Sequence, residues 1–118
     1  MTSGKQRSIE AMRRELLHSS ETLLGHSESD ALGRALRHFF PGLKQAFVVH
    51  SIPEQAENIY WILINSTEIA EIEIPRDNNI MMNSISLKIL NIDAYARKSL
   101  LREARRKLEI GVELMKNV

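Results

Sequence analysis

The chain contains no cysteine. This absence excludes a disulfide framework, and it excludes zinc and iron–sulfur sites that depend on thiolate ligands. No apolar run approaches the roughly 20 residues that a membrane-spanning helix requires. Residues 1–14 carry charges and no apolar stretch follows them, so we expect no secretory signal and a cytoplasmic location.

An excess of charge of either sign is also missing. Sixteen basic and 15 acidic residues leave a formal net charge of +1, which creates no overall field to attract nucleic acid or anionic membrane. Aromatic residues make up only 5% of the chain, so few rings are present on which bases can stack. Bulk composition therefore does not favour a nucleic-acid-binding protein.

Glycine is scarce, and its positions do not form a phosphate-binding loop. Gly25, Gly33 and Gly42 lie too far apart to cradle a phosphate. The serines lack a Gly-x-Ser-x-Gly setting for a nucleophile. We therefore predict no catalytic residue and no cofactor-binding residue.

The chain has the length and composition of one ordinary globular domain. It has 118 residues, of which 43% are hydrophobic and 26% are charged. A chain of this size buries roughly two thirds of its unfolded surface, which is enough for a core without metals or disulfides. We predict one α+β domain over residues 1–118, with residues 1–5 frayed.

Two helices are predicted before the sheet. Apolar residues at helical spacing mark the first, which ends near Gly25. Ser27 or Ser29 can cap the second, and Pro41 followed by Gly42 ends it. The apolar faces are Ile9, Met12, Leu16 and Leu23 in the first helix, and Leu32, Ala35, Leu36 and Phe39 in the second.

Four apolar stretches, separated by polar turn signals, predict a four-stranded antiparallel meander. The first strand is expected to end before Pro53, because proline cannot donate to a strand ladder. The second is apolar at both alternating sets of positions, which is typical of a strand covered on both faces. The predicted strands are 46–52, 59–64, 69–74 and 85–90.

The C-terminal region predicts helix. Asp93 can cap a first turn that contains Tyr95, and Ser99 can cap a second start. The apolar side of the long helix is Leu101, Ala104, Leu108, Val112 and Met115. The complete prediction is an α+β fold with two N-terminal helices, a four-stranded antiparallel meander and a long C-terminal helix packed on the sheet.

The histidines do not predict a metal site. His18, His26, His38 and His50 form neither a His-x-x-x-His pair nor a His-Glu-x-x-His motif. His50 with Glu54 and Glu57 supplies ligand atoms of the right kind, but these residues straddle a proline and have no preset geometry. We predict no metal ligand, and keep a small enzyme with a site near His50 and Glu54 as an alternative.

Acidic residues concentrate in the predicted sheet. Between residues 54 and 76 there are five acids and one base. Glu71 and Glu73 fall on one face of the third strand, opposite the apolar face of Ala70, Ile72 and Ile74. A half-exposed acidic strand face is either merely solvated or a recognition surface for a basic partner.

Basic residues concentrate in the final helix, where Arg102, Arg105 and Arg106 can form a stripe. Such a stripe can meet phosphates or an acidic protein, although Glu109 and Glu113 follow it along the helix. It can also pair with the acidic strand face in a homodimer. Nucleic-acid binding through this helix is therefore the first alternative function, ahead of the enzyme near His50 and Glu54.

The favoured hypothesis is a non-catalytic protein-interaction domain. A small inhibitor or immunity-type protein that binds a basic macromolecule is one form of it. The predicted partner-binding residues are Glu68, Glu71, Glu73, Arg102, Arg105 and Arg106. Tyr60 and Trp61 must point to opposite sheet faces, so one of them is a candidate interface anchor. Residues 80–82, an apolar Ile-Met-Met group, are predicted either to extend the core or to form an adaptable patch.

Overall fold

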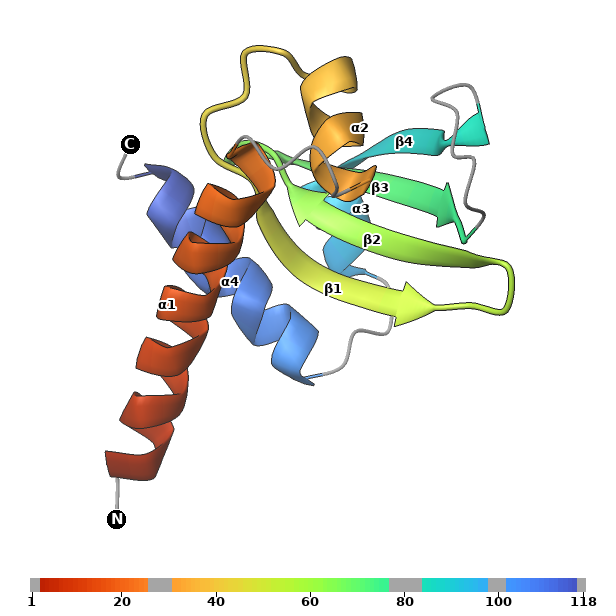
Figure 1. The fold of residues 1–118 in the computed structure, drawn as a ribbon. Helices are drawn as coiled ribbons and strands as arrows, with labels where there is room; N and C mark the ends of the chain where they lie inside the picture. Colours follow the sequence, from red (N-terminus) through yellow and green to blue (C-terminus); the bar gives the residue numbers. More distant parts are fainter. Residues whose placement is uncertain (1–2, 26–30, 77–83, 98–101, 117–118) are drawn as a thin grey trace.

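A computed structural model describes residues 3–25, 31–76, 84–97 and 102–116, with only the backbone of residues 3–8. Figure 1 shows the arrangement of its helices and strands. In chain order the elements are α1 (Ser3–Leu24), α2 (Ala31–Phe39), β1 (Phe47–Pro53), β2 (Glu57–Leu63), β3 (Glu68–Pro75), β4 (Ser86–Asn91), α3 (Ile92–Ala96) and α4 (Arg102–Lys116).

The four strands form one antiparallel sheet in the order β1-β2-β3-β4, and a C-terminal helix packs on it (Figure 1). This confirms the predicted α+β fold. The expectation that the first strand ends before Pro53 is wrong, since Pro53 is the last residue of β1 and pairs with Asn58. Proline is tolerated there because β1 is an edge strand, where one side of the backbone needs no strand partner.

Each face of the sheet is covered by different helices. On one side, which we call the α2 face, Ile62, Ala70 and Ile72 pack with α2 and the end of α1. On the other side, the α4 face, Leu63 and Ile69 pack with α1, α3 and α4. Ile62 and Leu63 are both 0% exposed although they are neighbours in the chain. The predicted cover on both faces therefore holds at the C-terminal end of the second strand, whereas residues 57–61 are only half-buried.

The tight turn between β2 and β3 is organised by one asparagine. Asn65 Oδ1 accepts hydrogen bonds from the backbone N–H groups of Thr67 and Glu68, both at 2.8 Å. Ile64 N–H also donates to the Glu68 carbonyl at 3.2 Å. An asparagine side chain replaces a backbone acceptor in this way, so the hairpin forms without glycine, as predicted.

The C-terminal helices differ in detail from the sequence prediction. Asn91, not Asp93, caps α3: its side chain accepts a hydrogen bond from Asp93 N–H at 2.7 Å, and Asp93 lies in the first turn. Ala104 and Leu108 of α4 are buried as predicted, together with Ile110 and Gly111. The proposed caps at Ser27 or Ser29, the helix start at Ser99 and the group at 80–82 lie outside the described residues. Among the described helices, none is both long enough and apolar enough to cross a membrane.

Candidate functional site

One partly exposed row of side chains crosses all four strands on the α4 face. The register places His50 opposite Trp61, Trp61 opposite Glu71, and Glu71 opposite Lys88. We call these four residues the sheet row. Because residues on one face alternate with a period of two, the row lies beside Leu63 on the same face.

A β-bulge brings His50 into the row. The register shifts between Val48, which pairs with Ile62, and His50, which pairs with Trp61. Without this extra residue, His50 would lie opposite Tyr60 and on the α2 face. A bulge therefore re-aims one side chain to the opposite surface, as bulges at sheet edges commonly do.

The Trp61 indole has two side-chain contacts, one at its ring face and one at its ring N–H. The His50 and Trp61 rings are stacked, with centroids 5.4 Å apart and an interplanar angle of 29°. Trp61 Nε1–H donates a hydrogen bond to Glu71 Oε1 at 2.8 Å. Trp61 is only half-buried, so a large aromatic side chain is held in one orientation while part of it stays accessible. Tyr60 packs against the opposite core, which confirms that the two aromatics face opposite ways.

A second row of side chains lies next to the sheet row on the same face. It is on the side of the sheet row that points away from Leu63 and the buried core. Ile59 pairs with Ile52 on one side and with Glu73 on the other. All three side chains are half-buried. The surface is thus apolar over β1 and β2 and acidic over β3, and exposed Lys88 of β4 lies opposite Glu71. We call the set His50, Ile52, Ile59, Trp61, Glu71 and Glu73 the Trp61 patch.

The predicted acidic residues do not all meet. Glu71 and Glu73 share the α4 face, as the alternation predicted. Glu68 begins β3, and the same alternation assigns it to the α2 side. Its Oε1 accepts a hydrogen bond from Asn65 Nδ2 at 2.9 Å, so it belongs to the β2–β3 turn. The structure therefore separates Glu68 from Glu71 and Glu73 on the sheet.

The predicted basic residues lie on α4, away from the sheet. Arg102 and Arg105 are exposed and Arg106 is half-buried. Since Ala104 and Leu108 form part of the buried side, the helical period turns Arg102 and Arg105 outward. Exposed Glu109 and Glu113 continue along the helix, so its outer face carries both signs of charge.

The alternative site near His50 and Glu54 is not assembled. His50 stacks on Trp61, whereas Glu54 is exposed at the β1–β2 turn, where its N–H donates to the Glu57 carbonyl at 2.8 Å. Four residues along an extended strand correspond to roughly 13 Å. Among the described residues, no group of three or more histidine, aspartate or glutamate side chains is placed to hold a metal ion.

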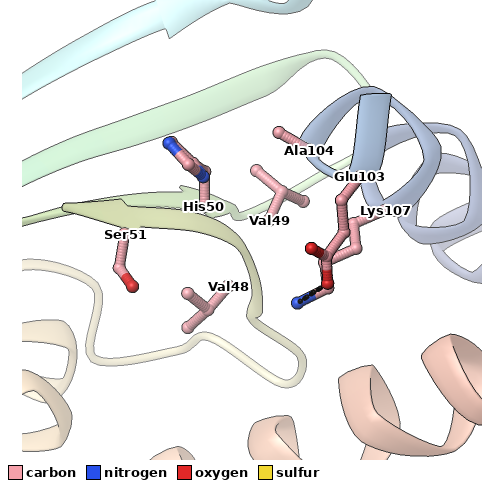
Figure 2. A pocket seen from close by; sticks show the side chains of 7 residues that line it. All are labelled: Val48, Val49, His50, Ser51, Glu103, Ala104 and Lys107. Carbon is pink, nitrogen blue, oxygen red and sulfur yellow. Dashed lines mark ion pairs between the residues drawn. The ribbon is translucent and has the colours of Figure 1, made fainter. Parts of the chain in front are cut away.

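A groove that the sequence did not predict runs between β1 and α4. It has a volume of about 260 Å³ and is lined by Val48, Val49, His50, Ser51, Glu103, Ala104 and Lys107. Figure 2 shows His50, Val49 and Ala104 on one side of the strand and Ser51 and Val48 on the other. The groove opens beside His50, where the sheet row begins. Sequence reasoning missed it because its two walls lie about 50 positions apart in the chain.

Charge in the helical wall of the groove is arranged around one lysine. Lys107 Nζ lies 3.4 Å from Glu15 Oε1 and 3.7 Å from Glu103 Oε1. The Lys107 side chain is 17% exposed, whereas those of Glu15 and Glu103 are 62% and 67% exposed. The exposed charge in this wall is therefore the Glu103 carboxylate, while Lys107 is largely covered between it and Glu15 of α1.

Tyr95 carries a buried hydroxyl that is not hydrogen-bonded within the described residues. Burial raises the pKa of Tyr95 to about 12. Replacing Tyr95 by phenylalanine is expected to raise the free energy of unfolding by about 1 kcal/mol at neutral pH, because a buried hydroxyl without a partner is costly. Urea denaturation of both proteins measures this difference.

The same pair of proteins should differ in alkaline solution. An unfolded tyrosine ionises near pH 10, while folded Tyr95 keeps its proton to about pH 12. The unfolded state therefore binds fewer protons in this interval, so the stability of the native chain falls as pH rises through it. Tyr95→Phe removes this contribution, and Tyr60→Phe serves as the control. Parallel pH profiles for the native chain and Tyr95→Phe would contradict the assignment.

The Trp61 patch combines the features of a recognition surface. It has an oriented aromatic ring, aliphatic neighbours and two adjacent carboxylates. Comparison of the chain with protein-family models, with curated proteins and with solved structures finds no match. The chemistry of these residues is accordingly the basis for assigning a role.

Proposed function

We propose that this protein is a non-catalytic protein-interaction domain that binds a basic partner through the Trp61 patch. The observation that carries the proposal is the fixed orientation of half-buried Trp61 between the His50 ring and the Glu71 carboxylate. An aromatic side chain that is already ordered loses little conformational freedom on binding. Tryptophan is also among the residues that contribute most to protein interfaces.

The charge of the patch favours a basic partner. Glu71 and Glu73 lie on one strand face beside Trp61 and Ile59. A lysine or arginine can pair with a carboxylate while its aliphatic stem packs on the apolar neighbours. An arginine or lysine can also lie over the face of an indole ring. An inhibitor or immunity-type protein that covers a basic surface would use such an arrangement.

The test measures binding of synthetic peptides to the full chain. We choose two basic probes, an extended peptide of alternating lysine and valine and a helical peptide of lysine and leucine, with an alternating glutamate–valine peptide as the acidic counterpart. Trp61 is the only tryptophan, so its fluorescence reports binding at the patch directly. At least one basic probe should bind and change this fluorescence, and the acidic peptide should not.

The carboxylates are tested with a double variant. Glu71→Gln combined with Glu73→Gln removes two charges, while glutamine at position 71 still has an oxygen that can accept the Trp61 hydrogen bond. Affinity for the bound probe should fall about tenfold, equivalent to about 1.4 kcal/mol. The matched control, Glu109→Gln with Glu113→Gln, changes the net charge equally on the outer face of α4 and should leave affinity nearly unchanged. Equal effects of the two pairs, or no binding of either basic probe, would refute the proposed function.

A further inference from the structure

The outer edge of β1 carries backbone groups without a strand partner. β1 is the first strand in the order β1-β2-β3-β4 and has a neighbour on one side only. Glu54 N–H donates to the Glu57 carbonyl at 2.8 Å, and the hydrogen-bonded pairs of an antiparallel ladder alternate. Counting back along β1, Ile52 faces β2, whereas the backbone groups of Ser51 face outward. Pro53, which lacks an N–H, falls in the outward-facing set as well.

This edge is open but short. Within the described part of the chain, no hydrogen bond from another element reaches the backbone of residues 48–51 on its outer side. α4 stands beside it and leaves the groove of about 260 Å³ between them. The bulge between Val48 and His50 and the terminal Pro53 limit the length that can pair. Such features protect an edge against indiscriminate pairing while leaving a short segment accessible.

We infer that the groove between β1 and α4 binds an extended, basic segment of a partner protein, which adds to the sheet as a further strand next to β1. This inference rests on the proposed function and specifies how the partner binds. Main-chain hydrogen bonds to the edge of β1 would supply affinity, as in other cases of strand addition. A partner residue placed beside His50 would extend the sheet row by one position and contact the Trp61 patch.

The charge of the groove selects a basic occupant over an acidic one. Its helical wall presents Glu103 to solvent, while Lys107, which pairs with Glu103 and with Glu15 of α1, is largely covered. Arg102 and Arg105 lie on the outward side of α4 and do not line the groove. An alternating lysine–valine segment can therefore place its basic side chains on the side of the sheet where Glu103 is exposed.

The experiment uses the extended lysine–valine peptide with N-methyl groups on alternate residues. Methylation of the set whose N–H groups face β1 should weaken binding at least tenfold, since main-chain hydrogen bonds to the edge of β1 are lost. Methylation of the other set should change affinity less than about threefold. This comparison needs no protein variant, so it does not depend on how a substitution affects folding.

A pair of protein variants tests the same edge from the other side. Ser51→Pro removes the outward N–H and should lower affinity for the unmethylated peptide about tenfold, with circular dichroism unchanged because an edge strand tolerates proline there. Ser51→Ala keeps the N–H and should bind like the native chain. If Ser51→Pro unfolds the domain, Ser51 N–H faces β2 and the proposed geometry is wrong.

Other outcomes separate this inference from the proposed function. If the helical peptide binds and the extended one does not, or if both methylated peptides bind equally, strand addition is refuted and the proposed function stands. If sedimentation shows that the chain self-associates and that Ser51→Pro abolishes this, the occupant is a second copy and the inference of a basic partner segment is refuted. If neither basic peptide binds, both proposals fail.

Discussion

Replacing Phe47 by alanine is expected to lower the free energy of unfolding by about 3 to 5 kcal/mol. Phe47 is 0% exposed and pairs with Leu63 in the centre of the core on the α4 face. Its ring lies where α4 approaches the sheet closely, since a Cβ added at Gly111 would be 3.6 Å from Phe47 Cδ2. Truncation leaves a cavity between strand and helix that the surroundings fill only in part. Urea denaturation measures the loss.

The control for Phe47→Ala is Phe40→Ala. Phe40 is only half-buried and packs at the margin of the core on the α2 face. Its truncation should cost less than about 2 kcal/mol, because less apolar surface returns to water. Since a domain of this kind is stable by about 5 to 15 kcal/mol, the first substitution removes a large fraction and the second does not. Equal losses would show that Phe47 does not have the packing role assigned to it.

Replacing Gly33 by alanine is expected to destabilise the protein by about 2 to 3 kcal/mol, although alanine is the better helix former. A Cβ at this position would lie 2.7 Å from the backbone oxygen of Leu23. That carbonyl cannot rotate away as a side chain would, and it also accepts a hydrogen bond from Arg37 Nη1 at 3.2 Å. The methyl group therefore pushes α2 away from the end of α1. Thermal and urea unfolding report the effect.

Gly42→Ala is the matched control for this close approach. No atom lies within 4 Å of a Cβ built at Gly42, and its backbone φ is not positive. The same chemical change should therefore alter stability by less than about 0.5 kcal/mol. If Gly42→Ala lowered the free energy of unfolding as much as Gly33→Ala, the close contact between α2 and the end of α1 would not be the cause of the effect at Gly33.

The sequence predicted the candidate site only where the alternation of side chains along a strand decides which face of the sheet each residue occupies. Glu71 and Glu73 were placed on one face correctly, because side chains in a strand alternate whatever surrounds them. Tyr60 and Trp61 were separated for the same reason. His50 was not linked to Trp61, because the bulge that aligns them is a property of the pairing between β1 and β2. Register across strands depends on long-range contacts that periodicity does not contain.

The exact ends of helices and strands also depend on contacts that the sequence pattern does not contain. Both Asn91 and Asp93 are capping residues by type, and the choice of Asn91 depends on where β4 ends. Pro53 was expected to stop the first strand, but its tolerance depends on β1 being at the sheet edge. In each case residue chemistry restricts the possibilities to a few. The neighbouring element then selects among them.

By itself, the sequence determined the class of this protein: an antiparallel four-stranded sheet between helices, without thiolate chemistry and with acids concentrated on one strand face. These properties follow from composition and from short periodic patterns. Only the tertiary structure decided that Trp61 is clamped by His50 and Glu71, and that β1 and α4 enclose a groove. The physical reason is that these arrangements join segments far apart in the chain, whose relative positions are set by packing of the whole core.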